Sequence, residues 1–164
     1  MPELTLRPAL VADAEEIARV QHESWSQAYK TLLSGDFPLR SEGERVALWQ
    51  QRLQEHPCHT LLAEQSGALV GFVYWLPGAA LEAQLRSLYL HPFFWRQGIG
   101  SALLRQAMGD MRHEGQRRVG LWVLANNVRA ERFYLSQGFY YDGQQQSKGS
   151  GRAIYLQRRM VRAL

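Results

Sequence analysis

The feature that most constrains the fold is a change of hydrophobic period around a pair of glycines. Residues 85–90 alternate as in a strand, and Pro92 ends that pattern because proline has no backbone N–H to donate. The alternation predicts one strand face made of Leu85, Ser87 and Tyr89. From Ile99 to Met111 the apolar residues recur at helical spacing. The sequence therefore predicts a strand that leads through a glycine loop directly into a helix.

The glycine loop is suited to bind an anion with backbone groups. Gly98 and Gly100 have no Cβ, so a phosphate can approach the amides and the backbone can adopt a positive φ. The unpaired N–H groups of the first helical turn, with the positive end of the helix dipole, point to the same place. Two glycines alone are equally consistent with a tight turn before an ordinary helix.

Two common nucleotide-binding motifs do not fit this loop. A P-loop requires Lys followed by Ser or Thr, whereas Ile99, Gly100 and Ser101 follow Gly98. A dinucleotide-binding fingerprint requires a third glycine where Leu103 stands. The anion site is therefore of another kind.

A second motif follows about thirty residues later. Residues 121–124 predict a short apolar strand, and Asn127 is a good N-cap for a helix that runs to about Ser136 and ends before Gly138. Ala130, Phe133 and Tyr134 share one helix face. The pattern Asn-x-x-Ala-x-x-Phe-Tyr-x-x-x-Gly-Phe after a Gly-x-Gly loop resembles the GNAT superfamily of N-acetyltransferases.

The order of elements along the chain agrees with this resemblance. We expect an α/β (α+β) fold with a mixed, mostly antiparallel sheet of about seven strands, flanked by about four helices, in one domain over residues 1–164. Residues 12–33 predict two helices with a bend near Ser24, before a break at 34–38. The glutamines at 144–146 predict a loop or a strand end.

The resemblance implies acetyl-CoA as the cofactor, with its pyrophosphate on the amides from Gln97 to Ser101. It places the pantetheine arm between the strand ending at Leu90 and the strand 121–124. The residues that it assigns to the cofactor are Leu88, Tyr89, Leu90, Arg96, Gln97, Gly98, Ile99, Gly100, Ser101, Asn127, Arg129, Ala130, Phe133 and Tyr134. The chain departs from the family at Trp95, where glutamine or arginine is usual. The pyrophosphate site, an amide cradle formed by the backbone from Gln97 to Ser101, should therefore depend on these amides and on Arg96.

The resemblance assigns Tyr134 the role of general acid for the leaving thiolate, and a phenol, with a pKa near 10, can give its proton to a thiolate at little cost. The base is open. Many relatives have a glutamate where this chain has Gln84, so Glu82, Glu23 and proton loss through water are three candidates. An aromatic wall for the acceptor would comprise Trp25, Tyr29, Trp75 and Tyr89, although core packing is the default for such residues.

The main functional expectation is acetyl transfer from acetyl-CoA to a primary amine by direct attack in a ternary complex. The acceptor could be a small amine, an amino acid, an antibiotic or a protein N-terminus. Two alternatives stay open. One is a weakly catalytic acyl-CoA-binding sensor, suggested by Gln84 and Trp95, and the other is a toxin that acetylates aminoacyl-tRNA, suggested only by the arginine surplus.

The amino-acid composition limits the compartment and the classes of binding partner that we expect. The 164 residues include 46% hydrophobic and 21% charged residues, with no apolar run long enough for a membrane span and no signal-peptide pattern, so we expect a cytoplasmic protein. The formal net charge of +4 comes mostly from arginine and makes nucleic acid an unlikely partner. Cys58 is the only cysteine, which excludes an internal disulfide and a thiolate metal cluster; we expect no bound metal. The closing strands could pair across a homodimer.

Overall fold

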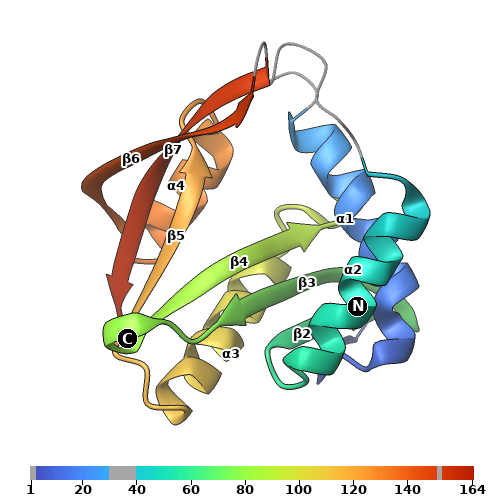
Figure 1. The fold of residues 1–164 in the computed structure, drawn as a ribbon. Coiled ribbons are helices and arrows are strands. Elements are labelled where there is room, and N and C mark those ends of the chain that lie inside the picture. Colours follow the sequence, from blue (N-terminus) through green and yellow to red (C-terminus); the bar gives the residue numbers. More distant parts are fainter. Residues whose placement is uncertain (1–2, 30–39, 151–152) are drawn as a thin grey trace.

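A seven-stranded sheet forms the centre of this computed structural model, which describes residues 3–29, 40–150 and 153–164 (Figure 1). The strand order is β1-β2-β3-β4-β5-β7-β6, and every neighbouring pair except β4 and β5 is antiparallel. The strands are β1 (Leu4–Pro8), β2 (Thr60–Gln65), β3 (Ala68–Leu76), β4 (Glu82–Leu90), β5 (Arg118–Leu124), β6 (Tyr140–Ser150) and β7 (Ala153–Ala163). The expected sheet is confirmed.

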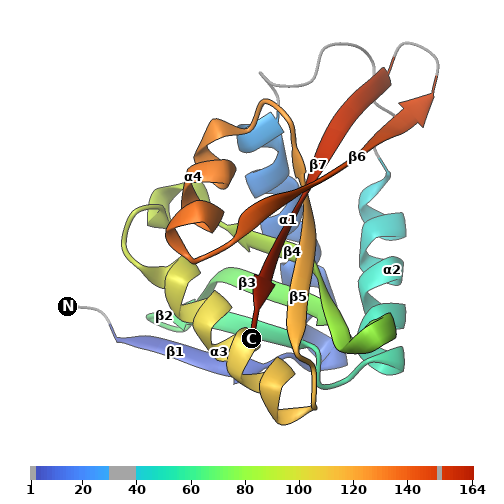
Figure 2. The same cartoon turned by 90° about the vertical axis from the view of Figure 1, so that its left-hand side faces the viewer.

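The α-helices in the described ranges cover both faces of the sheet (Figure 2). They are α1 (Ala14–Tyr29), α2 (Glu42–Glu55), α3 (Ile99–His113) and α4 (Val128–Ser136). One buried cluster joins α3 to β3, β4 and β5, with α4 packed against it, and a second joins α1 and α2 to β2 and β3. Trp49 is fully buried in the second cluster, and its indole N–H donates to the Gln21 side chain on α1, 2.8 Å away.

The sheet splits between β4 and β5. These parallel strands pair only where Glu82–Gln84 lies beside Arg118–Gly120. Beyond that point β4 stays with β3 while β5 stays with β7, and the two strands diverge (Figure 1). The split leaves an open wedge in the middle of the sheet, beside the pocket that forms the candidate functional site.

A β-bulge interrupts β4 at the edge of this wedge. Leu85 pairs with Trp75 and Ser87 pairs with Tyr74, so Arg86 is one extra residue without a partner in the register. The expected common face of Leu85, Ser87 and Tyr89 is therefore wrong: Leu85 packs in the α3 cluster, whereas Tyr89 packs against the α1–α2 cluster. The bulge shifts the alternation by one residue.

Two further expectations need correction. Helix α1 is continuous through Ser24 to Tyr29, because the Ser24 hydroxyl bonds to another element and leaves the helical backbone intact. The expected break at 34–38 lies outside the described residues. The glutamines at 144–146 belong to β6, and Gln145 and Gln146 pair with β7. No described helix is both long and apolar enough to cross a membrane.

Candidate functional site

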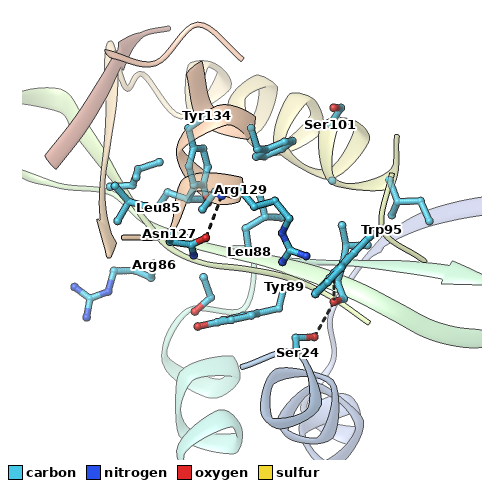
Figure 3. Close-up of a pocket in the computed structure, with 18 of the residues that line it drawn as sticks. Ser24, Leu85, Arg86, Leu88, Tyr89, Trp95, Ser101, Asn127, Arg129 and Tyr134 are labelled. Atoms are coloured by element: carbon cyan, nitrogen blue, oxygen red, sulfur yellow. Dashed lines mark hydrogen bonds between the residues drawn. The ribbon is translucent and has the colours of Figure 1, made fainter. Parts of the chain in front are cut away.

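A pocket of about 430 Å³ lies between the diverging ends of β4 and β5, bordered by the start of α3 and by α4 (Figure 3). The described residues that line it are Ser24, Leu85, Arg86, Ser87, Leu88, Tyr89, Leu90, Phe94, Trp95, Arg96, Gly98, Ile99, Gly100, Ser101, Leu121, Trp122, Val123, Asn127, Arg129, Ala130, Phe133, Tyr134 and Gln157. The wedge in the sheet thus holds both predicted motifs around one space.

The glycine loop delivers backbone amides to one end of the pocket. Gly98 is the N-cap of α3 with a φ of +80°, a conformation that favours glycine, and no side chain caps the helix start. At Gly100 a Cβ would lie 3.1 Å from Leu90 Cδ1 and 3.5 Å from Phe133 Cζ. The first turn of α3 therefore lies directly against the pocket wall, with its amides available to an anion.

Trp95 connects the loop to three other elements. Its indole N–H donates to the Leu90 carbonyl at 3.0 Å, and the Ser24 hydroxyl of α1 donates to the same oxygen at 2.8 Å. The Arg129 guanidinium of α4 lies 3.3 Å from the centroid of the Trp95 ring (Figure 3). This cation–π contact holds a positive charge beside the glycine loop.

Helix α4 brings the second motif to the same space. Asn127 is 8% exposed and caps the helix, because its Oδ1 accepts a hydrogen bond from the Ala130 N–H at 3.2 Å. Tyr134 lies among aromatic rings, 5.2 Å from Phe133 and 5.5 Å from Phe139 between centroids. These contacts fix the direction from which the Tyr134 side chain meets the pocket.

The structure gathers most of the residues that the resemblance assigns to the cofactor. The following line the pocket: Leu88, Tyr89, Leu90, Arg96, Gly98, Ile99, Gly100, Ser101, Asn127, Arg129, Ala130, Phe133 and Tyr134. Gln97 is not among the lining residues, and its side chain donates back to the Phe93 carbonyl at 3.3 Å. The contact of all these assigned residues with a cofactor stays a prediction.

The two candidate general bases are placed elsewhere. Glu82 is paired with Arg159, and with Arg118 at 3.8 Å, at the closed end of the wedge. The Glu82 hydrogen bond raises the pKa of Arg159 above its ordinary value, so this partner stays charged. Glu23 lies 3.2 Å from His91 Nε2. Neither carboxylate lines the pocket, which argues against both as the base.

The expected aromatic wall is largely not formed. Tyr89 lines the pocket, but Trp75 is 2% exposed and packs on His59 in the core, with 4.3 Å between ring centroids. Trp75 was therefore the wrong choice, because β3 is covered on both faces. Trp25 follows Ser24 on α1 but is not among the lining residues. The side chain of Tyr29 lies outside the described part of the chain.

Several lining residues were not expected, chiefly Ser24, Arg86, Trp122 and Gln157. Ser24 was detectable, because it continues the buried stripe of α1 four residues after Val20. Arg86 could not be assigned from the sequence, because only the split between β4 and β5 brings this strand residue to the pocket. Trp122 and Gln157 depend on the pairing of β5 with β7, which brings together residues 35 positions apart.

The charged side chains among the described lining residues are all positive. Among the described lining residues are three arginines, Arg86, Arg96 and Arg129, and no aspartate or glutamate. No three of the described His, Cys, Asp and Glu side chains are grouped so that they could hold a metal ion. The pocket is thus built to receive anionic groups.

Comparison with known proteins agrees with this geometry. The sequence model described as "Acetyltransferase (GNAT) family" matches residues 14–139. An uncharacterised N-acetyltransferase of Mycobacterium tuberculosis is 34% identical over 83 residues, which cover 51% of this chain and 53% of that protein. The matched segment therefore spans about half the length of that relative. A spermidine N(1)-acetyltransferase of Thermoplasma acidophilum is 27% identical over 142 residues, covering 83% of this chain and 88% of that protein.

Solved structures share the fold over nearly the whole chain. The PaiA N-acetyltransferase of Thermoplasma acidophilum, in complex with coenzyme A, superposes with a TM-score of 0.70 at 21% identity, covering 99% of both chains. A ribosomal-protein-alanine N-acetyltransferase of Brucella melitensis gives a TM-score of 0.76 at 23% identity, covering 98% of this chain and 99% of that one.

Proposed function

Because the chain belongs to the acetyltransferase (GNAT) family, we propose that it transfers the acetyl group of acetyl-CoA to a primary amine by direct attack in a ternary complex. The observation that carries this proposal is the pocket in the β4–β5 wedge, which combines an amide cradle, arginines and Tyr134. The coenzyme A named for the Thermoplasma structure of the same fold supports it.

The pocket fits the phosphates of coenzyme A at the α3 end. The amides of Ile99, Gly100 and Ser101 would bind the pyrophosphate, and the missing Cβ of Gly100 lets this turn lie close to Leu90 and Phe133. Arg96 and Arg129 would add charge at that end. The strand end Leu88–Leu90 and the Asn127 side chain would lie along the pantetheine arm.

Acetyl-CoA supplies the activated thioester. The residues of the chain then have two tasks, to orient the acceptor amine and to move protons. Tyr134 would donate its phenolic proton to the sulfur as the C–S bond breaks, because this neutralises the released thiolate and a phenol has a pKa close enough to that of a thiol to give up the proton at little cost. The amine would lose its proton to water at the pocket mouth, because no described lining residue is a carboxylate.

Thiol release from acetyl-CoA over a broad amine panel tests this function. We expect turnover with at least one amine, and we expect Tyr134→Phe to lower kcat by about 100-fold or more while the Kd for acetyl-CoA changes little. Tyr140→Phe is the matched control, because Tyr140 is 54% exposed and does not line the pocket; its kcat should equal that of the parent.

Two results would contradict the proposal in different ways. Equal kcat for Tyr134→Phe and the parent would remove Tyr134 from the acid role. Acetyl-CoA binding without thiol release across the panel would favour a cofactor-binding sensor over an enzyme.

A further inference from the structure

The arginines of the pocket fall into two groups at opposite ends. Arg96 and Arg129 lie beside the glycine loop and Trp95, where the cofactor phosphates are proposed to bind. Arg86 lies at the other end of the view, away from Trp95 and Ser101 (Figure 3). A cofactor held by the α3 amides would thus leave Arg86 on the side where an acceptor must enter.

Arg86 stands at the β4 bulge, directly after Leu85, which packs in the α3 cluster. Arg86 is the extra residue between the Leu85–Trp75 and Ser87–Tyr74 pairs, and alternation from Leu85 directs its side chain to the opposite face, which Tyr89 also occupies. The bulge changes the residues that follow: without it Ser87 and Tyr89 would share the α3 face with Leu85, whereas with it Leu88 and Leu90 pack there instead. The local backbone therefore presents a guanidinium at the acceptor end.

A second arginine, Arg52 of α2, interacts electrostatically with Arg86. Arg52 of α2 is stacked over Trp49, with 4.7 Å from its Cζ to the ring centroid, and over Tyr74 at 5.4 Å. Burial lowers the pKa of Arg52, and the nearby Arg86 and Arg40 lower it further, while Tyr74 opposes the shift. These arginines are thus close enough to repel one another.

No carboxylate neutralises this group in the described part of the chain. None of the ion pairs there involves Arg52 or Arg86. Glu55 acts on Tyr74 but pairs with neither arginine. Two neighbouring cations beside a pocket without a described lining carboxylate favour an anionic ligand over a cationic one.

We propose that the acceptor is an amine that carries a carboxylate, such as an amino acid, and that Arg86 binds this carboxylate while the amine faces the thioester. The inference rests on the proposed acetyl transfer. An arginine holds a carboxylate through two parallel N–H···O bonds, which would orient the nucleophile as well as bind it. A polycationic amine would find only repulsion at this end of the pocket.

Matched pairs of amines test the inference. The assay is thiol release from acetyl-CoA with the full chain, using each common amino acid, its carboxamide, and spermidine. We expect kcat/KM for the best amino acid to exceed that of its amide by about 10-fold or more, the range of one charged hydrogen-bonded pair. Spermidine should be a poorer substrate than either.

Substitution of Arg86 separates the carboxylate contact from a general structural role. Arg86→Gln should raise KM for the amino acid by about 10-fold or more and remove the preference over the amide, while kcat/KM for the amide changes by less than about 3-fold. Arg86→Lys should keep part of the preference. Arg105→Gln removes an exposed arginine of α3 that does not line the pocket, and it should leave the preference intact.

The possible failures are distinguishable. Amides or spermidine used as well as amino acids, or a preference that survives in Arg86→Gln, would overturn this inference and leave acetyl transfer standing. Absence of thiol release with every amine, despite acetyl-CoA binding, would overturn the proposed function and the inference with it.

Discussion

Trp95 contacts Arg129 of another helix and so helps to place a positive charge near the glycine loop. The family position usually carries a polar side chain, but here the indole N–H holds the Leu90 carbonyl and the ring face holds Arg129. Arg129 of α4 therefore adds its charge to that of Arg96 in the loop itself. This arrangement makes Trp95 a positioning residue for Arg129.

A double-mutant cycle between Trp95 and Arg129 tests that link. Trp95→Leu and Arg129→Gln should each raise the Kd for coenzyme A by about 3- to 10-fold, in line with about 0.5–1 kcal/mol for a cation–π contact and a charge on phosphate. The double variant should be no weaker than the weaker single variant. Trp95→Phe keeps a ring face and should retain most of the affinity; calorimetric titration measures all four values. Fully additive losses would show that the two side chains act independently.

Gly100 lies where the first turn of α3 packs closely against Leu90 and Phe133. Gly100→Val should raise the Kd for coenzyme A by at least about 10-fold, because a Cβ there already meets Leu90 and Phe133 and the branched side chain would extend over the amides. Gly109→Val is the matched control in the same helix, where a Cβ meets nothing within 4 Å. Both variants carry the same helix-propensity cost. Unchanged affinity in Gly100→Val would contradict the amide cradle.

At the scale of elements, an ion-pair cluster closes the narrow end of the wedge. Glu82 of β4 pairs with Arg118 of β5 and with Arg159 of β7, and Arg159 also lies 3.0 Å from Asp142 of β6. A Cβ at Gly120 would lie 2.9 Å from Arg159 Nη2, so glycine is needed there for the guanidinium to cross β5. Four strands are thus tied where the sheet begins to split.

Glu82→Gln separates this structural role from the general-base role. The variant should lose about 1–3 kcal/mol of unfolding free energy in urea denaturation, because Arg159 and Glu82 are only 14% and 19% exposed. Below its denaturation midpoint, its kcat should stay within about 3-fold of the parent. Arg118→Gln removes the partner that is 50% exposed and should cost less than about 1 kcal/mol. A kcat loss of 100-fold in Glu82→Gln would restore Glu82 as the base.

At the scale of the whole molecule, the protein consists of two halves that meet at a short seam. β1 to β4 with α1 and α2 form one half, and β5 to β7 with α4 form the other, joined through three parallel pairs and through α3. The pocket lies between the halves, so a bound cofactor would contact both. Binding should therefore stabilise the entire fold and not only a loop.

Thermal unfolding measures this coupling. Coenzyme A at about 100 times its Kd should add about 2.7 kcal/mol, which corresponds to a Tm increase of about 5–10 °C for a domain of this size. Pantetheine, which lacks the nucleotide phosphates, should give a much smaller increase at the same concentration. An equal shift with both ligands would mean that the glycine loop and its arginines contribute little.

Sequence alone was sufficient for the elements whose signals are local. The glycine loop, the Asn127 cap and the aromatic face of α4 follow from periodicity and capping, which act within a few residues, and their family pattern implied the sheet. Tertiary structure alone decided the rest. The bulge that puts Tyr89 on the face opposite to Leu85, the burial of Trp75, the ion pair of Glu82 with Arg159 and the contact of Trp95 with Arg129 each depend on segments that are distant in sequence. Their cause is the packing of side chains across strands and helices, which no local pattern encodes.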